Sequence, residues 1–234
     1  MIIPERLSVY INSLDSGNGA FLDELERTAI AEHVPVIRQD MQSFLKVLLA
    51  IRQPRRILEV GTAIGFSALL MAENTSSGCR ITTIENYEKR IAPARENIAR
   101  AGMEERITLL YGDAQKILPT MDESYDFIFM DAAKGQYIHF LPEVLRLLSS
   151  GGVLVSDNVL QDGDLIESHY AVEQRNRTIY KRMREYLYAL KHTDGLVTSV
   201  VPVGDGAAVT VKVNETTGYF PDKTEAINRK SPLQ

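Results

Sequence analysis

The chain has 234 residues, 44% of them apolar and 24% charged, which is typical of a globular protein with a sizeable core. Acidic residues outnumber basic ones by 31 to 26, so the chain has no overall positive field to attract nucleic acid, although local basic patches stay possible. A single cysteine excludes a disulfide framework. Residues 1–10 lack the apolar run of an export signal, and no apolar stretch approaches the ~18 residues of a membrane span, so we expect a cytoplasmic location and no membrane partner.

The pattern along the chain predicts an α/β fold. The first 52 residues are expected to form helices at 6–14, 21–33 and 39–51, the last with Met41, Phe44, Leu45 and Leu48 on its buried stripe. Beyond them, short apolar runs alternate with amphipathic segments, as in strands and helices around a parallel sheet. We expect strands at 57–60, 80–85, 107–111, 127–130, 152–156, 197–203 and 207–213. Helices are expected at 66–74, 87–101, 114–121, 138–148 and 172–190.

The end of the chain completes this organisation. Gly204-Asp205-Gly206 separates the last two strands and predicts a hairpin, so the sheet should end in an antiparallel pair. We expect a single domain over residues 1–213, with a helical part at 1–52. Residues 214–234 are polar and show no periodicity, and we interpret them as a tail.

The first three expected strands end in residues suited to an adenosyl ligand. Strand 57–60 runs into the glycine turn Gly61-Thr62-Ala63-Ile64-Gly65, whose spacing is not that of a dinucleotide site. An adenosyl group without a pyrophosphate is therefore favoured. Glu85 ends the second strand, where a carboxylate can bind both hydroxyls of a ribose. Asp113 follows the third strand, placed either to read an adenine edge or to cap the next helix.

The next two strands end in oxygen ligands. Asp131 follows strand 127–130, with Lys134 three residues later, and Asp157 and Asn158 follow strand 152–156. Two carboxylates and an amide oxygen at one sheet edge suit Mg²⁺ (or Mn²⁺) rather than zinc. Either aspartate alone would most often be a loop or cap residue. Beside a cation, Lys134 could serve as general base for a hydroxyl that the metal acidifies.

These residues together resemble the divalent-metal-dependent O-methyltransferases of the catechol and caffeoyl-coenzyme A type. The resemblance covers about residues 30–213 and rests on the runs E-V-G-T-A-I-G-F-S, M-D-A-A-K-G-Q-Y, S-D-N-V-L and P-V-G-D-G. It implies a Rossmann-like seven-stranded methyltransferase sheet, mostly parallel, with helices on both faces, and it implies a homodimer. Ala133 stands where plant members carry an acid, which weakens the coenzyme A class.

The resemblance also implies roles for single residues. Asp131, Asp157 and Asn158 match the metal ligands of the family, and Lys134 matches its base. The methyl donor S-adenosylmethionine (SAM) would be contacted by residues of the strand ends and of the N-terminal region: Ile37, Glu59, Gly61, Thr62, Ser67, Glu85, Ala114 and Asp131.

Within this superfamily, the segment 175–187 most closely resembles bacterial tRNA 5-hydroxyuridine methyltransferases. A helix there should bury Ile179, Met183, Leu187 and Leu190. Arg177, Lys181 and Arg184 should line an exposed stripe, which either follows RNA phosphates or is simply solvated. Tyr137 either borders the target base or packs in the core.

We therefore interpret the chain as a SAM- and Mg²⁺-dependent O-methyltransferase that makes 5-methoxyuridine at the wobble position, with the tRNA anticodon loop as its partner. Hydroxyuridine presents a hydroxyl beside a carbonyl, two vicinal oxygens that a cation can chelate. Bases in an anticodon loop are unstacked and accessible. Two alternatives remain: the same chemistry on a small catechol-like metabolite, and a SAM-binding RNA module without turnover.

Overall fold

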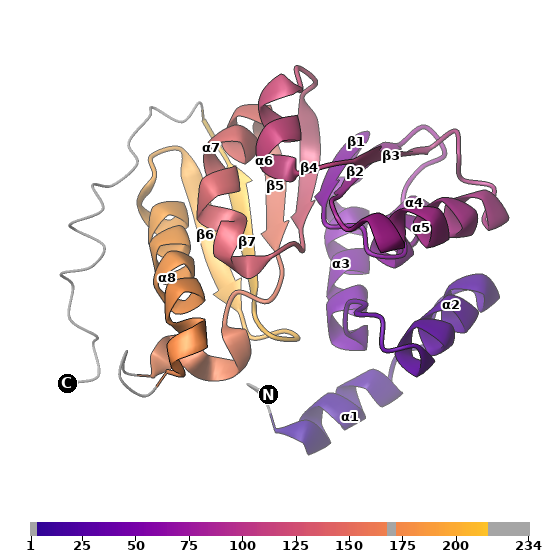
Figure 1. Cartoon of the computed structure of the whole chain (residues 1–234), viewed down its shortest axis with the longest axis horizontal. Coiled ribbons are helices and arrows are strands. Elements are labelled where there is room, and N and C mark those ends of the chain that lie inside the picture. Colours follow the sequence, from indigo (N-terminus) through magenta and orange to yellow (C-terminus); the bar gives the residue numbers. More distant parts are fainter. Residues whose placement is uncertain (1–3, 168–171, 215–234) are drawn as a thin grey trace.

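The chain forms a seven-stranded sheet with the strand order β3-β2-β1-β4-β5-β7-β6 (Figure 1). The structure is a computed structural model, and it describes residues 4–167 and 172–214. The strands are β1 (Arg56–Val60), β2 (Arg80–Glu85), β3 (Ile107–Tyr111), β4 (Tyr125–Met130), β5 (Leu148–Ser156), β6 (Leu196–Val201) and β7 (Ala207–Lys212).

Strands β1 to β5 are parallel, and β7 runs antiparallel to both β5 and β6. The predicted mixed sheet with an antiparallel C-terminal pair is therefore confirmed. The chain builds outward from β1 to β3 and then returns to place β4 on the other side of β1. Such a reversal opens a crevice at the carboxyl ends of the strands, which is where sheets of this kind bind ligands.

Helices surround the sheet in the order expected. They are α1 (Glu5–Ser13), α2 (Ala20–Ala31), α3 (Gln39–Arg52), α4 (Phe66–Glu73), α5 (Glu88–Arg100), α6 (Ala114–Ile117), α7 (Tyr137–Leu147) and α8 (Arg177–His192). Short 3₁₀ turns accompany them: η1 (Leu118–Thr120), η2 (Lys134–Gln136), η3 (Gln161–Ile166) and η4 (Gln174–Asn176). The helix expected at 172–190 begins later, because η4 precedes it.

The core has two layers, one on each face of the sheet. Ile128 and Met130 of β4 pack in the cluster that includes side chains of α6, α7 and α8. Phe127 and Phe129 alternate with them and pack in the second cluster, with side chains of α2 to α5. Successive side chains of a strand point to opposite faces. All four are fully buried, so β4 anchors both layers.

The buried face of α3 differs slightly from the prediction. Met41 and Leu45 are buried as expected, but Leu49 and Gln42 are buried with them. Phe44 and Leu48, which were expected to be buried, are only partly so. Periodicity missed Gln42 because its amide is polar. Its Nε2 donates to the Glu26 carboxylate at 2.7 Å and to the Ile37 carbonyl at 2.9 Å, which makes its burial favourable.

The buried face of α8 is also turned relative to the prediction. Met183 and Leu190 are buried as expected, but Ile179 and Leu187 are only partly buried. Tyr180 and Tyr186 take their place, because their hydroxyls find partners. The Tyr186 hydroxyl lies 2.6 Å from Ser156 Oγ, and that of Tyr180 donates to the Glu167 carbonyl at 3.1 Å.

Among the described residues, no helix is long and apolar enough to cross a membrane. The tail expected at 214–234 lies, from residue 215 onward, outside the described residues.

Candidate active site

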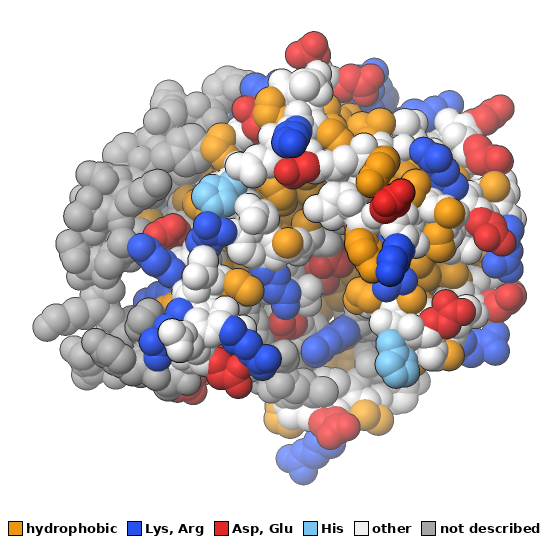
Figure 2. All heavy atoms as spheres, in the orientation of Figure 1, with side chains coloured by type: hydrophobic (Ala, Val, Ile, Leu, Met, Phe, Trp, Pro, Cys, Tyr) orange, Lys and Arg blue, Asp and Glu red, His pale blue; other side chains and the backbone are white. Residues whose placement is uncertain are grey.

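A cavity of about 620 Å³ opens at the carboxyl edge of the sheet. This size is in the range of small-ligand sites. Figure 2 shows a hollow in the middle of one face, with acidic and basic side chains in it. The structure brings most of the predicted site residues to the cavity wall: Ile37, Gly61, Thr62, Ser67, Glu85, Asp113, Ala114, Asp131, Lys134 and Asn158.

The glycine turn after β1 requires its first glycine. Gly61 has a φ of +102°, and a Cβ atom there would lie 2.0 Å from the Asp131 carbonyl oxygen. No side chain fits that space, and the conformation itself is strained for other residues. The turn therefore passes directly beside the end of β4, which joins the two halves of the cavity.

Glu85 is held on the cavity wall by backbone amides. Its Oε2 accepts from the N–H of Ala63 at 2.8 Å and of Thr62 at 3.3 Å, and its Oε1 accepts from the N–H of Tyr87 at 2.7 Å. These charge-assisted hydrogen bonds fix the carboxylate between the β1 turn and the end of β2. Its position suits recognition of vicinal hydroxyls.

Glu59 lies behind the turn and does not line the cavity, although it was predicted to contact SAM. It is fully buried, and it accepts from Ser67 Oγ and Thr83 Oγ1, each at 2.5 Å. The Thr83 hydroxyl is also 2.5 Å from that of Thr62. Burial raises the pKa of Glu59 from 4.5 to about 7. Glu59 thus holds cavity-lining residues through their hydroxyls.

Asp113 performs the capping role left open above, and it also lines the cavity. Its Oδ1 accepts from the N–H of Gln115 at 2.9 Å, which caps α6. Sequence reasoning missed several other wall residues, among them Val36, Tyr87, Arg90 and Phe140. Tyr87 and Arg90 follow Glu85 closely, so their position after a strand end was the available signal.

The aspartates after β4 and β5 are neighbours. Met130 pairs with Ser156 in parallel register, so Asp131 and Asp157 are the next residues on adjacent strands. The N–H of Asp157 donates to the Met130 carbonyl at 3.0 Å. Burial raises the pKa of both carboxyls, and repulsion from Asp131 raises that of Asp157 further. Two carboxylates are thus held together in a poorly solvated place.

This donor set fits a hard divalent cation. Within residues 4–167 and 172–214, no group of three or more His, Cys, Asp and Glu side chains is arranged for a metal. Asn158, which lines the cavity next to Asp157, offers a neutral amide oxygen beside the two carboxylates. A cation would offset the repulsion between the two carboxylates, and carboxylate and amide oxygens are ligands that Mg²⁺ and Mn²⁺ accept.

Lys134 lies on η2, and its side chain, 34% exposed, reaches the cavity wall. Its Nζ is 3.2 Å from Oδ2 of Asp205, a buried residue of the β6–β7 turn. The sequence motif G-D-G indicated only a hairpin there. Lys134 also lowers the pKa of both Asp131 and Asp157 by its charge, which places it beside the candidate metal ligands.

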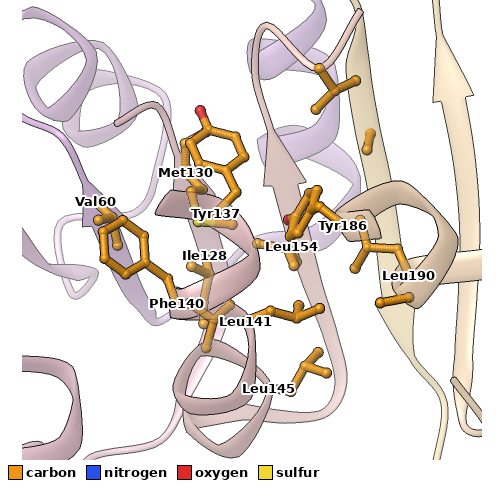
Figure 3. Close-up of a cluster of buried hydrophobic side chains, with 14 of the residues drawn as sticks. Val60, Ile128, Met130, Tyr137, Phe140, Leu141, Leu145, Leu154, Tyr186 and Leu190 are labelled. Atoms are coloured by element: carbon orange, nitrogen blue, oxygen red, sulfur yellow. The ribbon is translucent and has the colours of Figure 1, made fainter. Parts of the chain in front are cut away.

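Tyr137 packs in the core, so the prediction that it borders a substrate base is wrong. It is fully buried, and its ring meets that of Tyr186 edge-on with centroids 5.5 Å apart (Figure 3). Its hydroxyl lies 3.1 Å from the carbonyl oxygens of both Met130 and Asp157, which share its single proton. One side chain therefore bridges the ends of β4 and β5.

The predicted basic stripe on α8 is partly engaged within the chain. Arg177 Nε donates to the Val172 carbonyl at 3.2 Å, and Arg184 Nη1 donates to the Leu165 carbonyl at 2.9 Å. Lys181 is the most exposed of the three predicted residues, with Nζ 4.0 Å from the Glu185 carboxylate. Basic side chains gather over α8, beside the hollow (Figure 2).

The fold and the site define a Rossmann-like α/β protein with a nucleoside-sized cavity and an oxygen-rich pair of strand ends. Residues 12–213 match the O-methyltransferase family, and the chain belongs to that family. The catechol O-methyltransferase of Mycobacterium tuberculosis is 31% identical over 166 residues, 70% of this chain and 76% of that relative.

Solved structures show the same relationship. A candidate caffeoyl-CoA O-methyltransferase of Staphylococcus aureus superposes with a TM-score of 0.83 at 29% identity, covering 89% of this chain and 100% of that one. An O-methyltransferase of Bacillus cereus, solved in complex with SAH, has a TM-score of 0.77 at 26% identity, covering 88% and 97%.

The bridge made by Tyr137 predicts an effect on metal binding. Tyr137→Phe removes the hydroxyl that holds the ends of β4 and β5 together, so the affinity for Mn²⁺ should fall about tenfold or more, as for other residues that support metal ligands. Calorimetric titration of the folded chain with Mn²⁺ measures this. Tyr125→Phe is the matched control, because its hydroxyl bonds to Thr82 at 3.3 Å, at the opposite end of β4. Equal Mn²⁺ affinity in Tyr137→Phe and wild type would contradict the bridging role.

The raised pKa of the buried Glu59 carboxyl predicts that the stability of the fold depends on pH. Its pKa is about 7 when folded and ordinarily 4.5, so between these values the folded chain holds a proton that the unfolded chain releases. The free energy of unfolding should therefore fall as pH rises through this window, by on the order of 3 kcal/mol from this group.

The Glu59→Gln variant has no such proton. Its free energy of unfolding, measured by urea unfolding, should therefore fall less between pH 5 and 7 than that of wild type. Asp131 and Asp157 are present in both proteins, and the exposed Glu24→Gln serves as control. The same slope in wild type and Glu59→Gln would refute the assignment.

Proposed function

We propose that this protein transfers the methyl group of SAM to one of two vicinal oxygens of a small catechol-like substrate, with a divalent cation held by Asp131, Asp157 and Asn158. The observation that carries the proposal is that Asp131 and Asn158 line a nucleoside-sized cavity, while Asp157 follows the neighbouring strand beside Asp131. The catechol and caffeoyl-CoA names of the relatives support the small substrate.

The residues of the first three strand ends would bind the methyl donor. Glu85 is fixed by three backbone amides and faces the cavity, where its carboxylate can accept from both ribose hydroxyls. Asp113 and Ala114 line the cavity after β3, where they would contact an adenine edge, and Gly61 lines it at the end of β1. The neighbour crystallised with SAH supports an adenosyl ligand here.

The residues of β4 and β5 would bind and orient the acceptor. A divalent cation, when bound, lowers the pKa of a coordinated hydroxyl. Lys134 lines the cavity, and in its neutral amine form it would take the proton of that hydroxyl and become an ammonium. Most of the catalytic contribution would come from positioning, since methyl transfer needs the two reacting atoms aligned.

A second candidate substrate is 5-hydroxyuridine at the wobble position of tRNA, which would be converted to 5-methoxyuridine. The observation that favours it is the group of basic side chains over α8, beside the hollow, of which Lys181 is well exposed. Phosphates of an anticodon loop could bind there.

Homodimerisation, which the family resemblance implies, also stays a prediction.

Methyl transfer from labelled SAM tests the proposed chemistry. Wild-type protein should methylate a catechol or 5-hydroxyuridine-containing tRNA, and EDTA should abolish transfer. Asp157→Ala should lose at least 100-fold in kcat, while its Kd for SAM stays within about threefold, because Asp157 does not line the cavity. Metal-independent transfer by wild type, or normal transfer by Asp157→Ala, would rule out the metal role.

A charge reversal on α8 separates the two substrates. Lys181→Glu should leave catechol turnover unchanged, and on tRNA it should lower kcat/KM severalfold at low salt if that substrate is used, because one phosphate contact is lost. Arg56→Glu, at the exposed amino end of β1 and so at the end of the sheet opposite the cavity, is the matched control. Equal activity of both variants on tRNA would exclude α8 as an RNA-binding surface.

A further inference from the structure

The turn between β6 and β7 carries a buried carboxylate. Asp205 is 2% exposed, although it lies in a Gly204-Asp205-Gly206 turn, where side chains are usually solvated. A buried carboxylate is costly unless it is paired or hydrogen-bonded. Hairpin formation alone needs only the flanking glycines, so the acidic residue calls for a separate explanation.

Lys134 is a charged partner of this carboxylate. Its Nζ lies 3.2 Å from Asp205 Oδ2, with the lysine side chain 34% exposed and the aspartate side chain 3% exposed. The pair joins the loop after β4 to the turn before β7, which are 71 residues apart in sequence. Because the aspartate is buried, water screens this ion pair less than a surface pair.

The same turn holds the loop that carries Asn158. The N–H of Val159 donates to the Gly206 carbonyl at 2.9 Å, and the N–H of Leu160 donates to the Asp205 carbonyl at 3.0 Å. Gly206 has a φ of +82°, and a Cβ there would lie 2.3 Å from Leu160 Cγ. The close approach of the turn to this loop therefore depends on glycine.

A third contact ties the turn to the other side of the cavity. The N–H of Gly204 donates to Oδ2 of Asp40 at 2.9 Å, in the first turn of α3. Just before that helix, Val36 and Ile37 line the cavity. The β6–β7 turn thus contacts the start of α3 through Gly204, Lys134 through Asp205, and the loop after β5 through Asp205 and Gly206.

We propose that Asp205 is a positioning residue for the methyl transfer proposed above, on which this inference rests: its buried carboxylate fixes the Lys134 amine at the cavity wall. Asp131 and Asp157 are near enough for the charge of Lys134 to lower the pKa of both, and all three follow the ends of β4 and β5. Without Asp205, the amine would turn toward them and compete with a cation for their oxygens. Asp205 keeps the lysine and the metal ligands separate.

Asp205→Asn tests this role, since the amide keeps the shape but not the charge, and Asp205→Ser serves as a second variant. We expect kcat to fall at least tenfold while the Kd for SAM stays within twofold. The Kd for Mn²⁺ should rise severalfold, which is a readout independent of turnover. Asp194 is an exposed acid in the turn before β6, and Asp194→Asn is the matched control. It should match wild type in kcat and in the Kd values for SAM and Mn²⁺.

A double-variant cycle distinguishes positioning from a general structural loss. In a Lys134→Ala background, Asp205→Asn should cause no further loss of kcat and no further rise in the Kd for Mn²⁺, because the amine it restrains is gone. Additive losses would overturn this inference but not the proposed function. The same holds if wild type is active and Asp205→Asn leaves its kcat unchanged. A wild type that methylates neither substrate would instead overturn the proposed function.

Discussion

Two carboxylates held side by side in a poorly solvated place are the constraint on which the rest of the site depends. The parallel register of β4 and β5 makes Asp131 and Asp157 neighbours, and burial raises the pKa of both. Such an arrangement opposes folding unless a positive charge compensates it. The charge of Lys134, which is paired with Asp205, lowers the pKa of both carboxyls, and the donor set is suited to a divalent cation.

The surrounding structure keeps these charges in place. Tyr137 bridges the two strand ends from the core side, and Asp205 holds Lys134 from the β6–β7 turn. On the cofactor side, Glu59 supports the hydroxyls of Thr83 and Ser67, while Glu85 is fixed by backbone amides. Membership of the O-methyltransferase family accounts for the fold that brings these elements together.

The strands, their mixed pairing and the cavity wall could be predicted, because strand-end residues of a parallel sheet converge by topology. The buried face of α8 and the burial of Asp205 could not be predicted, because they depend on partners that are distant in the sequence. Tyr180 and Tyr186 replace Ile179 and Leu187 on the buried face of α8 because their hydroxyls bond to other segments. The burial of Asp205 likewise follows from a residue 71 positions away, which no local pattern contains.

The most direct test of the account is a crystal structure of the chain grown with Mn²⁺ and S-adenosylhomocysteine, with the metal located by anomalous diffraction. The account predicts one strong anomalous peak bonded to oxygens of Asp131, Asp157 and Asn158, at the end of the cavity that holds the ligand. A peak elsewhere, or none among these three side chains in a crystal that contains the ligand, would contradict it.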